Sequence, residues 1–264
     1  MTPGTALPTT LADFGPAALA AVVVAGYLVV GEPMVGQVLH RRFEGRLRTD
    51  PGARRSFYRR LLVLEWGLSL LVLAIWLGAP DVDAAAVGLR WPQSWPGPVT
   101  GAVVVLVLLF VLVSTRALRG GALLEAAPTT RRPGDGRHSE PPAHATLALL
   151  PRTPGERRLF TVVGITAGVC EEWLYRGFFL AVVSAVAGGP PIWVLVAVAA
   201  GAFGLAHAYQ GGVGILTTGV LGGIMAALYL QTGSLLLPVL LHAAIDLRFL
   251  LVPARLLPAG RGAR

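Results

Sequence analysis

The sequence predicts an all-α fold, a polytopic bundle of about seven transmembrane helices. Hydrophobic residues make up 54% of the 264-residue chain, charged residues only 14%, and the mean hydropathy is +0.66. This composition is too apolar for a soluble domain of that length. Several apolar runs are also long enough to cross a hydrocarbon core, which takes about 20 residues. The third observation is that the arginines gather in alternate connections between these runs.

The first three spans are expected at residues 14–31, 61–79 and 99–115, where Pro, Gly and Arg flank apolar segments. The connection 32–60 holds eight arginines and is therefore expected in the cytoplasm. This orientation places the N-terminus outside the cell membrane. The connection 80–98, which contains Arg90 as its single basic residue, is expected outside as well.

Residues 121–146 are expected to form a disordered cytoplasmic linker, because they are rich in Pro, Gly, Ser, Thr and charge and lack apolar periodicity. The linker divides an N-terminal three-span region, 1–120, from a C-terminal four-span region, 147–264. His138 and His144 in the linker are interpreted as solvated residues rather than metal ligands.

The last four spans are expected at residues 159–182, 192–208, 212–230 and 235–252, which returns the C-terminus to the cytoplasm. The net charge of +8 comes from arginine alone, since the chain has no lysine. Because these arginines lie beside membrane spans, they indicate contact with the lipid bilayer rather than with nucleic acid. Cys170, the one cysteine, is interpreted as a packing residue.

The span 159–182 contains three charged residues, Glu171, Glu172 and Arg176. Charged groups inside a membrane are costly and seldom persist without a partner or a task. Glu172 and Arg176 are four residues apart and should form an ion pair on one helix face. Glu171 points about 100° away from Glu172 and is left without this partner, which suits it to proton transfer. The alternative is an ion-paired cluster that serves packing alone.

Two later predicted spans, 192–208 and 235–252, each contain a histidine. His207 ends the segment AAGAFGLAH, and His242 and Asp246 are four residues apart in LLHAAIDLRF, so they share a helix face. That spacing suits a histidine held by a carboxylate, or a metal site with two ligands on one helix. Together with the acid pair, these residues predict a functional site inside the membrane.

At these residues the chain resembles the CPBP family, which comprises CAAX prenyl proteases and bacteriocin-processing intramembrane proteases. The matching motifs are EEWLYR for Glu-Glu-x-x-x-Arg, FGLAH for Phe-x-x-x-His, and HAAID for His-x-x-x-Asn/Asp. The lead-in TPGERRLF is also similar. The resemblance covers about 147–252, so the function is expected to reside in the C-terminal half.

The resemblance implies an intramembrane endopeptidase in which Glu171 is the general base that activates water. It further implies that Glu172 and Arg176 orient the site and that three more residues complete it, namely His207, His242 and Asp246. The implied substrate is a membrane-associated protein or peptide, either a CAAX-type protein or a bacterial peptide. Two alternatives from other classes are a non-enzymatic bacteriocin self-immunity or scaffold protein and a proton-coupled transporter, although the sequence contains no convincing inverted repeat.

Asp246 departs from the asparagine that many relatives carry. An ionised carboxylate cannot donate a hydrogen bond to an oxyanion, whereas an asparagine can. Asp246 is therefore protonated, or orients His242, or binds a cation together with His207 and His242. The soluble zinc-protease motif His-Glu-x-x-His is absent. A divalent metal such as zinc stays an open alternative, and we favour the metal-free form. The oligomeric state does not follow from the sequence.

Overall fold

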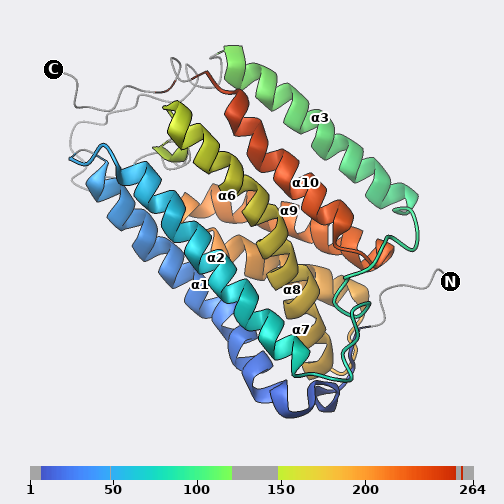
Figure 1. Cartoon of the computed structure of the whole chain (residues 1–264). Helices are drawn as coiled ribbons and strands as arrows, with labels where there is room; N and C mark the ends of the chain where they lie inside the picture. The colour runs from blue at the N-terminus through green and yellow to red at the C-terminus, as the bar shows by residue number, and fades with distance from the viewer. Residues whose placement is uncertain (1–6, 48, 121–147, 254–256, 258–264) are drawn as a thin grey trace.

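The computed structural model describes residues 7–47, 49–120, 148–253 and 257, and all regular secondary structure in these ranges is helical (Figure 1). The prediction of an all-α bundle is therefore confirmed. The linker expected at 121–146, with His138 and His144, lies outside the described residues.

Two long helices form one edge of the bundle. A 3₁₀ segment, Leu11–Ala17, leads into α1 (Ala18–Arg46), and α2 (Ala53–Leu77) packs beside α1. The connection expected at 32–60 is shorter than predicted, because helical structure continues on both sides of it. Hydropathy marks where apolar side chains end, whereas the helices extend beyond that point into arginine-rich turns.

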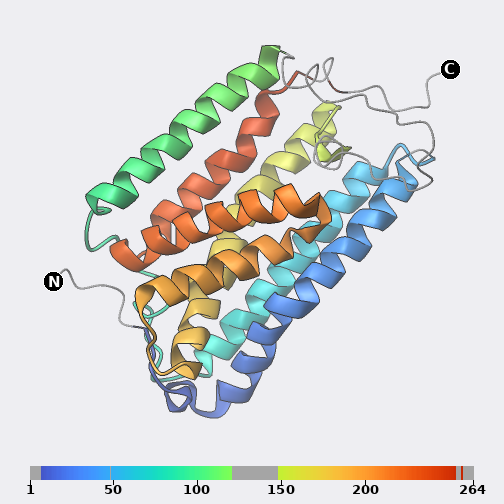
Figure 2. The ribbon, with the colours of Figure 1, turned by 180° about the vertical axis from the view of Figure 1, so that it is seen from behind.

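The helix α3 (Pro98–Gly120) lies at the opposite edge, as the two views in Figure 1 and Figure 2 agree. Many of its apolar side chains point away from the protein. Val99, Leu106 and Phe110 are 78%, 63% and 61% exposed. A helix with so much exposed apolar surface is suited to contact with lipid.

Four helical segments within the described ranges are long and apolar enough to cross a membrane, namely 11–46, 53–77, 98–117 and 208–232. The chain is thus a multi-pass membrane protein. Two of the other predicted spans correspond to shorter helices, α8 (Ile192–Ala206) and α10 (Leu236–Leu247), with 15 and 12 residues. These are shorter than the roughly 20 residues of a complete crossing.

The C-terminal half begins with α6 (Pro154–Glu172), whose first turn is capped by Thr153 and Glu156. The amide of Glu156 donates to Thr153 Oγ1 at 3.2 Å, and the amide of Thr153 donates to Glu156 Oε2 at 3.1 Å. The helix then widens into a π-helical stretch, Trp173–Phe179, and continues as α7 (Leu180–Val186). The predicted span 159–182 lies within this continuous rod. Such π-helical turns are frequent at functional sites.

Small residues allow the remaining helices to pack closely. The helix α9 (Gly211–Thr232) lies against α8, where a Cβ on Gly204 would be 2.6 Å from the carbonyl oxygen of Ile215. Likewise, a Cβ on Gly168 of α6 would be 3.0 Å from the Ala243 side chain of α10. Close approach through small residues is typical of helices in membranes. Gly168 lies one turn before Glu172, so this contact brings the acid pair up to α10.

The N-terminal helices also pack on the π-helical stretch. The hydroxyl of Tyr175 donates to the carbonyl of Leu28 in α1 at 3.2 Å, and the indole of Trp173 donates to the carbonyl of Ser69 in α2 at 3.3 Å. Both donors are buried. The two halves of the chain therefore meet at the segment that carries the charged motif.

Candidate active site

The predicted ion pair between Glu172 and Arg176 is present at the centre of the bundle. Arg176 Nη1 donates to Glu172 Oε1 at 3.0 Å, and both side chains are 0% exposed. Arg176 Nη2 donates to the carbonyl of Gly222 at 3.2 Å, and its guanidinium lies 4.2 Å from the ring centroid of Phe203. Arg176 thus ties the acid pair to both α8 and α9.

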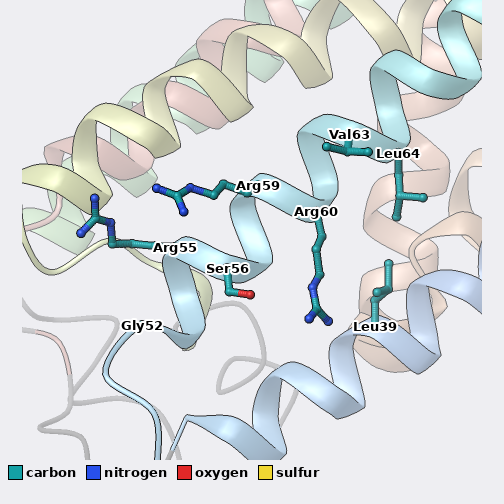
Figure 3. A pocket seen from close by; sticks show the side chains of 8 residues that line it. All are labelled: Leu39, Gly52, Arg55, Ser56, Arg59, Arg60, Val63 and Leu64. Atoms are coloured by element: carbon teal, nitrogen blue, oxygen red, sulfur yellow. The ribbon is translucent and has the colours of Figure 1, made fainter.

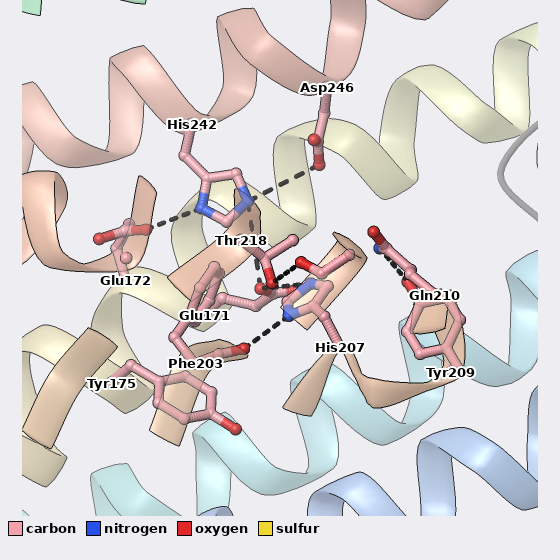
Figure 4. Close-up of polar contacts among 12 residues, drawn as sticks. Glu171, Glu172, Tyr175, Phe203, His207, Tyr209, Gln210, Thr218, His242 and Asp246 are labelled. Atoms are coloured by element: carbon pink, nitrogen blue, oxygen red, sulfur yellow. Dashed lines mark hydrogen bonds and ion pairs between the residues drawn. The ribbon is translucent and has the colours of Figure 1, made fainter. Parts of the chain in front are cut away.

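Glu172 has a second partner that the sequence did not reveal. His242 Nδ1 lies 2.7 Å from Glu172 Oε1, and Figure 4 shows the imidazole between Glu172 and Asp246. Since an ionised carboxylate accepts hydrogen bonds only, Nδ1 of the imidazole carries a proton, and its Nε2 faces away from Glu172. Glu172, rather than Asp246, is the carboxylate that holds the Nδ1 of His242.

His207 is held by the helix that precedes it. It is the C-terminal cap of α8, and its Nδ1 lies 2.9 Å from the carbonyl oxygen of Phe203, one turn earlier. A carbonyl only accepts, so Nδ1 carries the proton of this ring as well. Both imidazoles therefore have a fixed orientation that leaves Nε2 available.

The two Nε2 atoms face the carboxylate of Glu171. Glu171 Oε2 is 4.0 Å from His207 Nε2 and 4.0 Å from His242 Nε2. This oxygen is buried and has no hydrogen-bond partner within the described part of the chain. Polar atoms separated by more than about 3.5 Å are commonly joined by a bridging water. The separations of 4.0 Å between Glu171 Oε2 and the two Nε2 atoms therefore suit a bridging water.

Asp246 lies on the same side of His242. Its Oδ2 is 3.8 Å from His242 Nε2, and its carboxylate is partly exposed to the cavity. The structure thus brings all six predicted residues together, in two groups. Glu172 and Arg176 form the buried support, and Glu171, His207, His242 and Asp246 form the cavity wall.

The cavity has a volume of about 240 Å³ and is lined by residues from both halves of the chain. Helices α1 and α2 contribute two carboxylates to its wall, Glu32 and Glu65. In the described part of the chain, Glu65 Oε2 is buried and lacks a hydrogen-bond partner. Sequence reasoning missed both residues. Glu65 could have been found from the sequence, because it is a charged residue inside the predicted span 61–79.

The cavity wall does not have the dimensions of a zinc site. In a tetrahedral site with bonds of roughly 2.0–2.1 Å, neighbouring ligand atoms are about 3.3 Å apart. The corresponding distances here are 4.0 Å from Glu171 Oε2 to each imidazole and 3.8 Å from Asp246 Oδ2 to His242. Among the described residues, no three His, Cys, Asp or Glu side chains have an arrangement that could hold a metal ion.

A comparison with known protein families gives a match. Residues 154–248 match the model of the Rce1-like family, described as type II CAAX prenyl endopeptidase. The chain carries an Rce1-like region. This match confirms the resemblance predicted from the three motifs. A search of curated proteins finds no match to the chain, and a search of solved structures finds none either.

The Rce1-like region contains all six predicted site residues, whereas Glu32 and Glu65 lie outside it. The family is one of proteases and implies a peptide substrate in a membrane context. Cys170, next to Glu171, is a free thiol that is buried. The helices α1 and α2, which precede the Rce1-like region, also contribute residues to the lining of the cavity.

Proposed function

We propose that the protein is an intramembrane endopeptidase that hydrolyses a peptide bond of a membrane-associated substrate with a water molecule activated by Glu171. The observation that carries this proposal is the position of Glu171 Oε2, which has no hydrogen-bond partner among the described residues and lies 4.0 Å from the Nε2 of both His207 and His242. A general base must be within hydrogen-bond reach of the proton that it abstracts, directly or through one water.

In the proposed reaction, a water molecule lies between Glu171 and the two imidazoles. Glu171 takes a proton from this water, and the hydroxide adds to the carbonyl carbon of the scissile bond. The tetrahedral intermediate collapses when the C–N bond breaks. The proton held by Glu171 passes to the leaving nitrogen, so that the carboxylate is restored for the next cycle.

The other residues have distinct proposed roles. Arg176 balances the charge of Glu172, and Glu172 fixes the ring of His242 through Nδ1. His207 and His242 delimit the position of the attacking water through their Nε2 atoms. Asp246 lies beside His242 Nε2, where a protonated carboxyl can donate a hydrogen bond to the oxyanion. The spacing of the cavity wall supports this metal-free form.

The family description and the location of the cavity among apolar helices support a proposal for the substrate class. We propose a CAAX-type protein or a bacterial peptide that reaches the cavity from the membrane. We also propose that the arginine-rich ends of α1 and α2 face the cytoplasm, because basic residues favour that side. The N-terminus and the connection 80–98 then lie outside.

Proteolysis by the purified full-length protein tests the proposal. The protein in phospholipid vesicles is incubated with a prenylated CAAX-type peptide and with an unmodified peptide of the same sequence, and products are identified by mass spectrometry. The matched control is His242→Phe, which keeps an aromatic ring but removes both nitrogens. We expect one peptide bond of the prenylated peptide to be cleaved by the native protein, with little cleavage by the variant. Equal cleavage by both proteins, or none by either, would refute the proposal.

A further inference from the structure

A second hollow lies beside the catalytic cavity, at the arginine-rich ends of α1 and α2. This groove, which we call the arginine groove, has a volume of about 670 Å³. Figure 3 shows its lining, which consists of Leu39, Gly52, Arg55, Ser56, Arg59, Arg60, Val63 and Leu64. Leu39 and Leu64 also line the catalytic cavity, so the two hollows are neighbours.

Within the part of the chain that the structure describes, no acidic side chain balances the charge of the groove. Its described lining includes three arginines and no acidic residue. In the described ranges, Arg55, Arg59 and Arg60 make no side-chain hydrogen bond and no ion pair, whereas the nearby Arg46 pairs with Asp50. Guanidinium groups have a planar set of donors that matches phosphate oxygens. The free arginines therefore favour an anion with phosphate chemistry.

The apolar part of the groove follows the charged part along α2. Val63 and Leu64 lie one turn beyond Arg59 and Arg60, which corresponds to about 6 Å along the helix axis. Val63 is 72% exposed and Leu64 43% exposed. From the N-terminal end of α2 toward its middle, the groove therefore presents first a cationic part and then an apolar part. A phospholipid has the same order of phosphate and acyl chain.

We propose that the arginine groove binds an anionic phospholipid, with its anionic headgroup between Arg55 and Arg59 on one side and Arg60 on the other, as Figure 3 places them, and an acyl chain along Leu39, Val63 and Leu64. A zwitterionic lipid fits less well, because its ammonium group would face the same arginines. Since Leu39 and Leu64 border both hollows, the bound lipid lies at the edge of the catalytic cavity. Anionic lipid should therefore influence access of substrate to that cavity.

A pair of double variants separates a defined site from general surface charge. Arg59→Gln/Arg60→Gln removes two charges of the groove, and Arg41→Gln/Arg42→Gln removes two exposed charges of α1 outside it. Both are made in the full-length protein, and binding of phosphatidylglycerol in mixed vesicles with phosphatidylcholine is measured by native mass spectrometry. An arginine near an anionic surface contributes about 1 kcal/mol, so two correspond to about 30-fold in affinity.

We expect phosphatidylglycerol to bind about 30-fold more weakly to the groove variant and at nearly native strength to the α1 variant. Inorganic phosphate in large excess should leave the lipid bound, because it offers no acyl chain to Val63 and Leu64. The proposal is wrong if both variants lose equal affinity, if phosphatidylcholine binds as well as phosphatidylglycerol, or if phosphate alone displaces the lipid. These readouts do not require proteolysis, so they stand apart from the proposed activity.

Discussion

Replacement of Arg176 by alanine tests the buried ion pair. Arg176 and Glu172 are both fully buried, and Arg176 also binds the Gly222 carbonyl and stacks on Phe203. Arg176→Ala would leave the Glu172 carboxylate without its cation in the centre of the bundle. Breaking a buried pair in this way costs about 3–5 kcal/mol. For a chain of this size that corresponds to a fall in Tm of about 10 °C.

The matched control removes both charges together. In Glu172→Gln/Arg176→Met, the glutamine oxygen can still accept the hydrogen bond from His242 Nδ1, and methionine fills much of the space of the arginine stem. We expect this double variant to be more stable than Arg176→Ala alone, because no charge is stranded. Thermal unfolding in the same detergent measures both. An unchanged Tm for Arg176→Ala, or a double variant that is less stable than the single one, would refute the reasoning.

Three further predictions concern the cavity and the topology. Asp246→Asn should keep activity within about tenfold of native, since the amide can donate a hydrogen bond to an oxyanion, and its activity should be insensitive to chelators. An inactive variant, together with stoichiometric zinc in the active native protein, would contradict this prediction. Glu65→Leu should raise Tm, since an unsatisfied buried polar group costs about 1–3 kcal/mol; a lower Tm would show that Glu65 has a stabilising partner. A reporter that is active only outside the cytoplasm should be active when inserted in 80–98 and inactive when inserted in 121–146, and the reverse result would overturn the proposed orientation.

The fold could be predicted largely from hydropathy. Each predicted apolar segment corresponds to a helix, and the positions of α8 and α9 agree within a few residues. Helix ends were less accurate, because α1 continues to Arg46 and α2 begins at Ala53 in segments rich in arginine. Arginine is a good helix former, so charge marks the edge of a membrane span without ending the helix.

The site could be predicted in part because some of its contacts are local. The spacing of four residues between Glu172 and Arg176 places them on one helix face, and this pair is present. The contact between Glu172 and His242 joins residues 70 positions apart in sequence. It depends on the close approach of α6 and α10 at Gly168, which a single sequence does not reveal.

The cavity wall from α1 and α2 could not be predicted for a similar reason. Glu65 is visible in the sequence as a charge within an apolar span, which marks it as a residue of interest. Its neighbours depend on how α2 packs against α6, and that arrangement is tertiary. The family motifs lie within 154–248 and therefore contain no information on these helices.

The most direct test of the proposed mechanism is the turnover of Glu171→Gln on the peptide that the native protein cleaves. Glutamine has the shape of glutamate but cannot take a proton from water, so we expect turnover to fall by about 10²–10⁴-fold. The Tm should stay close to native, since Glu171 Oε2 has no hydrogen-bond partner to lose within the described residues. A folded Glu171→Gln protein that cleaves the peptide within a few-fold of the native rate would contradict the role of Glu171 as general base.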